Sequence, residues 1–216
     1  MTTSPNSEYA NLDAAFQFFN DKLFADELPG VLVTIHNHPR AKGFFRRGAF
    51  SQRGNSSVTT DEICLCPDAN TGRSDLDILS TLVHEMVHLW QYHLGDAPRR
   101  CYHDREFASK MEEVGLMPSD TGMVGGRRTG QSMTHYVIEG GAFEVACCEL
   151  LAGGWKLQWE EASVLSFDLT GGIGGATNSG KAKPTRRKFV CSKCGMAAQA
   201  KLSAKLKCGQ CDEAMV

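Results

Sequence analysis

The chain has 216 residues, of which 42% are hydrophobic and 22% are charged, so it can bury a full hydrophobic core like an ordinary globular protein. The net charge is only −2, and no stretch is apolar for long enough to cross a bilayer, which argues against a membrane protein. The first twenty residues lack the basic start and apolar run of a signal peptide, so we expect a cytoplasmic rather than a secreted protein.

The charge is distributed unevenly along the chain. Residues 181–216 contain nine Lys and Arg and two acidic residues, a net charge of +7, which leaves −9 on residues 1–180. Such a split predicts that the C-terminal end, rather than the body, binds a polyanion.

The first predicted element is an amphipathic helix over residues 11–27, in which apolar residues recur every three or four positions. Leu28-Pro29-Gly30 ends this helix. Three extended runs follow, at Val31–His38, Gly43–Ser51 and Val58–Cys66, with turn-forming residues between them. We expect them to form a small, mainly antiparallel sheet.

The second predicted helix, from Asp75 to about Leu94, contains the sequence HEMVH at residues 84–88. Residues four apart lie one turn above each other, so His84 and His88 can direct both imidazoles at one metal ion. In H-E-x-x-H zinc peptidases the glutamate does not bind the metal but takes a proton from the zinc-bound water. The motif therefore predicts a catalytic zinc with Glu85 as the general base.

A shorter helix is predicted over residues 104–114, and residues 118–130 have the composition of a loop. His135–Ile138 is predicted as a strand and Ala142–Leu151 as a helix. From Leu169 to Pro184 the sequence is rich in Gly, Ser, Thr, Asn and Lys, which is typical of a flexible tether.

A catalytic zinc needs a third protein ligand and an open position for water. His103 begins the helix over residues 104–114, after a Gly95–Pro98 break that lets the chain fold back, and we predict it as the third ligand. Glu106 and Glu112 remain fallback ligands.

The other histidines are expected outside the ligand set. His93 lies nine residues after His84, about 180° around the helix, and should lie at the surface. His36 and His38 alternate along a predicted strand and are assigned to packing or the surface. His135 is a candidate for a contact with a metal ligand or with substrate, and Tyr102, Tyr136 and His135 are candidate oxyanion stabilisers.

The nine cysteines are an odd number, and four of them form two C-x-x-C pairs, as metal ligands would. Thirteen residues separate the pairs, in a segment too short and too poor in apolar residues to fold by core burial alone. We predict a closed, structural zinc site formed by Cys191, Cys194, Cys208 and Cys211. The remaining five are expected to be reduced, buried thiols without assigned chemistry: Cys64, Cys66, Cys101, Cys147 and Cys148.

Basic residues surround the two cysteine pairs and could contact DNA phosphates without reading the base sequence. The candidate contacts are Arg186, Arg187, Lys188, Lys193, Lys205 and Lys207. Phe189 is the only aromatic residue of this segment, so stacking on bases is poorly supported. A solvated basic tail around a structural zinc remains the alternative.

Several motifs together resemble the SprT-like family of zinc metallopeptidases. They are Leu23-Phe24 with Leu28-Pro29, Ala41-Lys42-Gly43-Phe44, the HEMVHLWQ stretch, and Tyr102-His103-Asp104-Arg105-Glu106-Phe107. The resemblance covers roughly residues 10–151 and the tail, and it implies that His103 is the third zinc ligand.

The resemblance implies an α+β, zincin-like metallopeptidase domain over residues 8–168, a basic linker over 169–187 and a four-cysteine zinc ribbon over 188–216. It implies two zinc ions, one catalytic and one structural, and an endopeptidase acting on DNA-associated or DNA-crosslinked proteins. The alternative is a DNA-binding regulatory or stress-response factor whose zincin domain is structural or weakly active, against which the intact Glu85 argues.

Overall fold

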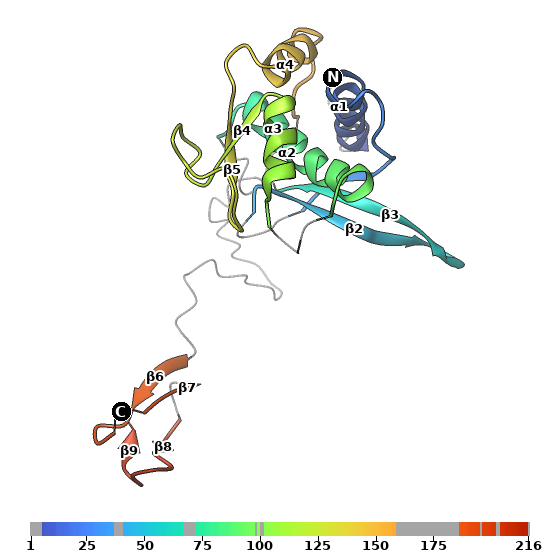
Figure 1. Cartoon of the computed structure of the whole chain (residues 1–216). Helices are drawn as coiled ribbons and strands as arrows, with labels where there is room; N and C mark the ends of the chain where they lie inside the picture. The colour runs from blue at the N-terminus through green and yellow to red at the C-terminus, as the bar shows by residue number, and fades with distance from the viewer. Residues whose placement is uncertain are drawn as a thin grey trace, which may run out of the picture. The chain divides into compact units, whose positions relative to one another are not determined.

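The computed structural model describes residues 6–36, 41–66, 72–97, 99, 102–158, 186–194, 196–201 and 204–215. The chain divides into two compact units, Met1–Ser163 and Val164–Val216, which we describe separately (Figure 1). His38, Cys101 and nearly all of the predicted linker lie outside the described residues. Within the described residues, no helix is long and apolar enough to cross a membrane.

The first helix, α1 (Asn6–Phe24), begins and ends earlier than the sequence predicts. Its first turns are polar, so they do not show the apolar periodicity on which the prediction rests. The helix ends where Ala25 and Asp26 adopt positive φ angles of 53° and 60°. The Asn20 side chain then stabilises the turn, because it donates to the Leu28 carbonyl and accepts from the Leu28 N–H, at 3.2 and 3.1 Å.

The main sheet contains β1 (Leu32–Ile35), β2 (Gly43–Gln52) and β3 (Asn55–Leu65) in the order β1-β3-β2. β2 and β3 form an antiparallel hairpin, whose tip extends away from the helices in Figure 1. Because β3, not β2, lies beside β1, the β1–β3 pair is parallel. The sheet is therefore mainly antiparallel as predicted, because its longer ladder joins β2 and β3, but it also contains one parallel pair that was not predicted.

A second, two-stranded sheet pairs β4 (Leu116–Ser119) antiparallel with β5 (Thr134–Val137). The composition of residues 118–130 predicts a loop, but Pro118 and Ser119 belong to β4. Proline is tolerated here because β4 pairs with β5 on one side only and is therefore an edge strand.

The remaining helices of the first unit are α2 (Asp75–Leu94), α3 (Arg105–Glu113) and α4 (Ala142–Ala152), so this unit is α+β as predicted. Ser74 caps the start of α2 with a capping box. Its hydroxyl accepts a hydrogen bond from the Asp77 N–H, and its own N–H donates to the Asp77 carboxylate.

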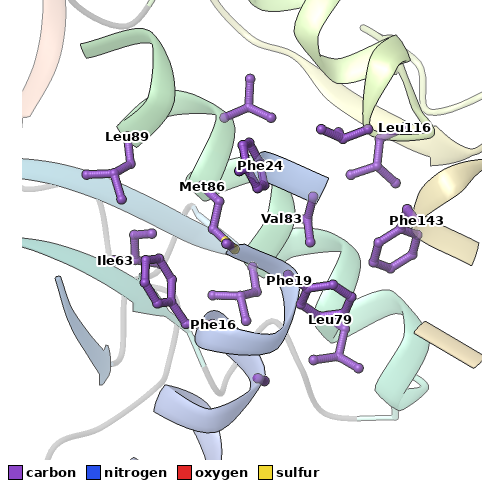
Figure 2. Close-up of a cluster of buried hydrophobic side chains, with 14 of the residues drawn as sticks. Phe16, Phe19, Phe24, Ile63, Leu79, Val83, Met86, Leu89, Leu116 and Phe143 are labelled. Atoms are coloured by element: carbon purple, nitrogen blue, oxygen red, sulfur yellow. The ribbon is translucent and has the colours of Figure 1, made fainter. Parts of the chain in front are cut away.

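The core of the first unit surrounds α2 (Figure 2). Leu79, Val83 and Met86 of α2 are fully buried and face side chains from α1, β3, β4 and α4, which include Phe19 and Phe143. Burying each such side chain stabilises the fold by about 1.5–3 kcal/mol. The helix that carries the HEMVH motif is therefore held from several sides.

The second unit contains two antiparallel strand pairs, β6 (Arg186–Val190) with β7 (Ala197–Lys201) and β8 (Leu206–Lys207) with β9 (Ala214–Met215). A bridge between Cys191 and Met215 joins the pairs. The buried core of the second unit contains Phe189, Cys191, Cys208 and Met215, so half of these core residues are cysteines.

Candidate metal centre

Three imidazoles converge between α2 and the start of α3. His84 and His88 lie one turn apart on α2, and His103 precedes α3. One ring nitrogen from each lies within 4.8 Å of the others, and the Nε2 atoms of His88 and His103 are 3.1 Å apart. His84 and His103 are buried, whereas His88 is partly exposed.

Backbone pairing with Gly130 holds His103 in place. The His103 N–H donates to the Gly130 carbonyl at 2.8 Å, and the Gly130 N–H donates to the His103 carbonyl at 2.9 Å. The Nδ1 atom of His103 also lies 3.2 Å from the Gly130 carbonyl. A carbonyl only accepts, so Nδ1 carries the hydrogen and Nε2 presents its lone pair to the cluster.

A buried glutamine, Gln91, ties the two metal-site helices together. Its amide donates to the carboxylates of Asp104 and Glu106, at 2.9 Å each, and Asp104 in turn caps α3 by accepting from the Phe107 N–H. Gln91 follows His88 by three residues within the HEMVHLWQ stretch, but the sequence does not show which partner it would meet.

The histidine cluster suits a metal that binds neutral imidazole. Burial lowers the pKa of His88 to about 3, helped by the proximity of His103. Burial, followed by the neighbouring histidines, also holds the pKa of His84 well below its usual range. In a tetrahedral site with Zn–N distances of about 2.0–2.1 Å, two ligand nitrogens are about 3.3 Å apart. The 3.1 Å separation of His88 and His103 is close to this value.

Glu85 lies beside the cluster but outside its set of ligand atoms. Burial raises the pKa of Glu85 to about 8, and a hydrogen bond from the Phe45 backbone N–H opposes this rise. A cation held by the adjacent histidines would favour the charged carboxylate. This environment suits a proton acceptor next to a metal.

Strand β2 approaches α2 closely at Gly43. A Cβ atom at Gly43 would lie 2.9 Å from the Cys64 carbonyl oxygen, 2.9 Å from the Thr81 Cγ2 and 3.3 Å from the Glu85 Cγ. The absence of a side chain therefore lets the strand pass directly against the Glu85 side chain.

Replacing Gly43 with alanine is expected to displace Glu85 or the strand and to destabilise the first unit by about 1–3 kcal/mol. Any cleavage activity should fall with it. Thermal unfolding and rates of protein cleavage measure the two effects. Gly30→Ala is the matched control, because a Cβ there meets no atom within 4 Å. Equal stability of the two variants would contradict the close approach.

The fallback ligands and the other histidines have partners elsewhere. Glu106 accepts from Gln91 and from the Asp96 N–H, and Glu112 pairs with Arg128. His93 lies 2.6 Å from Asp61, remote from the cluster as expected. Exposed His36 lies 3.4 Å from Glu62.

His135 of β5 lies against His84, 51 positions away in sequence. Its Nδ1 is 3.2 Å from the Nδ1 of His84, and its Nε2 is 2.9 Å from the Ser80 hydroxyl. Burial lowers the pKa of His135 to about 4, with Lys42 and Arg73 contributing. Tyr102 has Arg99 over its ring, at 4.3 Å from the centroid, and the role of Tyr102 and Tyr136 as oxyanion stabilisers remains a prediction.

The sulfur atoms of Cys191, Cys194, Cys208 and Cys211 also lie within 4.8 Å of one another. Backbone N–H groups of Gln210 and Cys211 donate to the Cys208 sulfur and lower its pKa to about 7. Cys194 and Cys208 are 3.5 Å apart, near the separation of about 3.8 Å for two thiolates on one tetrahedral zinc. The set therefore fits a closed zinc site.

Of the predicted DNA-contacting residues, Lys193, Lys205 and Lys207 are exposed on the second unit. Residues 186–188 form part of β6, but their side chains lie outside the described part of the chain.

The cysteines outside this cluster are mostly buried, as expected. Cys64, Cys66 and Cys147 are buried, and burial raises the pKa of Cys147 to about 12. Cys148 is the exception, because it lies on the exposed side of α4.

Comparison with known proteins identifies a family and a relative of this chain. The model of the SprT-like family matches residues 12–131, which include all three clustered histidines. An uncharacterized protein in the mucB 3'region of Salmonella typhimurium is 42% identical over 55 residues, or 26% of this chain and 73% of that protein. His135, α4 and the second unit lie beyond the family match.

Proposed function

Because the chain belongs to the SprT-like family, which is associated with zincin-like metallopeptidases, we propose that it is a zinc-dependent endopeptidase. The observation that carries this proposal is the convergence of three histidine nitrogens beside the buried carboxylate of Glu85. In this proposal His84, His88 and His103 hold the catalytic zinc.

Zinc at this position would lower the pKa of a bound water to about 7 and polarise the peptide carbonyl. Glu85 would accept a proton from the attacking water on its carboxylate, to which the Phe45 N–H donates a hydrogen bond. Glu85 can then return the proton to the leaving amine. The test is to compare cleavage of an unfolded protein by the wild-type chain and by Glu85→Gln.

Strand β2 is a suitable place for the substrate backbone. It is an edge strand of the three-stranded sheet, and its Gly43 and Phe45 lie against Glu85. An extended peptide that adds to the edge of a sheet gains main-chain hydrogen bonds without a requirement for particular side chains. We propose that substrate binds in this way, which suits unfolded or exposed segments of many proteins.

We also propose that the second unit is a zinc ribbon that binds DNA, so that the peptidase acts on DNA-associated or DNA-crosslinked proteins. Residues 181–216 carry a net charge of +7, and about +5 would remain after four thiolates bind one zinc. Phe189, the one aromatic residue in the sequence of residues 181–216, is 1% exposed and is therefore unavailable for stacking on bases. The expected contacts are therefore with phosphates.

Combined replacement of Lys193, Lys205 and Lys207 by glutamine is expected to weaken DNA binding at all sequences alike. The slope of log K against log salt should fall by about one for each phosphate that the variant no longer neutralises. A salt titration of DNA binding by the full-length chain measures this slope. The control replaces Lys22 and Lys156, two exposed lysines of the first unit. An unchanged slope in the triple variant would remove these residues from the DNA interface.

A further inference from the structure

His135 is connected through hydrogen bonds to both a metal-site histidine and the backbone of α2. It is 3.2 Å from His84 through the Nδ1 atoms, and its Nε2 is 2.9 Å from the Ser80 hydroxyl. The Ser80 hydroxyl in turn donates to the carbonyl of Asp77 at 2.8 Å. These four residues form a continuous chain from the N-terminal turns of α2 to the histidine cluster.

The Asp77 carbonyl fixes the direction of this chain, because a carbonyl can only accept. Ser80 gives its hydrogen to Asp77 and therefore accepts from the Nε2–H of His135. A neutral imidazole with its hydrogen on Nε2 has a lone pair on Nδ1, so His135 accepts there. The Nδ1 of His84 must then carry a hydrogen, which leaves the Nε2 of His84 with its lone pair.

We propose that His135 is a positioning residue for the metal site, which fixes the tautomer and ring orientation of His84 so that its Nε2 faces the metal. The inference rests on the proposed function, since it concerns the same three-histidine site. Among the described residues, His135 is not part of the group of ligand atoms that lie within 4.8 Å of one another. It therefore acts through His84 rather than as a fourth ligand.

The partner of His84 differs from the partner of His103. His103 donates its Nδ1 hydrogen to a backbone carbonyl, that of Gly130, and carboxylates and carbonyls are the usual partners of metal-binding histidines. His84 instead donates to a neutral imidazole from a separate strand. The orientation of the first ligand on α2 thus depends on the position of β5.

The test measures zinc affinity by chelator competition in the full-length chain, with zinc content followed as the chelator increases. The zinc that is missing from a His88→Ala variant identifies the histidine site, and zinc at the cysteines serves as the internal reference. His135→Phe keeps a ring but removes the acceptor. His135→Asn places a carbonyl oxygen near the former Nδ1 and can still accept from His84.

His135→Phe is expected to weaken zinc binding at the histidine site by about 10–100-fold, and His135→Asn should restore most of this loss. Ser80→Ala should have a smaller effect in the same direction, because it removes the hydrogen-bond acceptor of the His135 Nε2–H but leaves the contact with His84. The control is His93→Phe, the same substitution at an exposed position on the other side of α2, which should leave zinc affinity unchanged. Equal unfolding temperatures of the zinc-free variants would exclude a general loss of folding.

The results separate this inference from the proposed function. If the wild-type chain binds zinc at the histidines and His135→Phe binds it equally well, only the role of His135 is overturned. Equal losses in His135→Phe and His135→Asn would also overturn it, because they indicate ring packing or direct ligation. If the wild-type chain holds zinc only at its cysteines, both proposals fall.

Discussion

Replacing Glu85 with glutamine is expected to reduce the rate of protein cleavage by about 10²–10⁴-fold, the usual contribution of a general base. The amide oxygen can still accept the Phe45 N–H, but the side chain can no longer take a proton from water. Zinc should remain bound, because Glu85 is not one of the grouped ligand atoms. The measurement is the initial rate of cleavage of an unfolded protein, with and without DNA, together with zinc content.

A matched variant, Glu149→Gln, removes a carboxylate from the exposed side of α4, where it pairs with Lys22. It should cleave at the wild-type rate. Equal cleavage by Glu85→Gln and the wild-type chain would refute the peptidase mechanism. Loss of activity accompanied by loss of zinc would instead show that Glu85 contributes to metal binding.

Removing the metal from the cysteine cluster is expected to unfold the second unit while the first unit stays folded. The buried core of the second unit has two cysteines among its four residues, so little apolar surface remains to oppose the loss of chain entropy. Structural zinc contributes about 10–16 kcal/mol to folding in comparable small domains. Replacing Cys208 with serine should remove most of this stabilisation, because it removes one of the four grouped sulfur ligands, at a position that is only 1% exposed.

Hydrogen exchange of backbone amides in the full-length chain measures this effect separately in each unit. In Cys208→Ser, protection should be lost in β6–β9 and kept in α2. The control is Cys148→Ser, which changes an exposed cysteine on α4 and should alter neither unit. Persistent protection of the second unit in Cys208→Ser would show that it folds without the metal.

The parts of the fold that follow from local sequence could be predicted. The apolar spacing of α2 and the serine before Asp75 define that helix, and the chain break before His103 indicates how it returns to the first two histidines. Asp104 marks the start of α3, and its side chain does cap that helix. These features depend on neighbours within a few residues of each other.

Features that depend on distant pairing could not be predicted in the same way. The residues of β4 include Pro118 and follow Gly115, so their composition is typical of a turn. They form a strand because they pair with β5, which is distant in sequence. The sequence makes His135 a candidate for contact with a metal ligand or with substrate, but it does not identify His84 as the partner, because that contact depends on the pairing of β4 with β5. The parallel β1–β3 pair likewise depends on strand order, which alternation of residues does not specify.

Two backbone hydrogen bonds join His103 to Gly130, so the segment between these residues is closed at its base. At its tip, Met123 and Val124 are 71% and 83% exposed, and insertions are best tolerated at such exposed loop tips. A fluorescent label or short affinity tag could therefore be inserted between these two residues without changing the length of chain that links His103 to α2. This loop tip offers an attachment point in the segment between His103 and Gly130, beyond α3 and β4, and away from the two residues whose backbones pair.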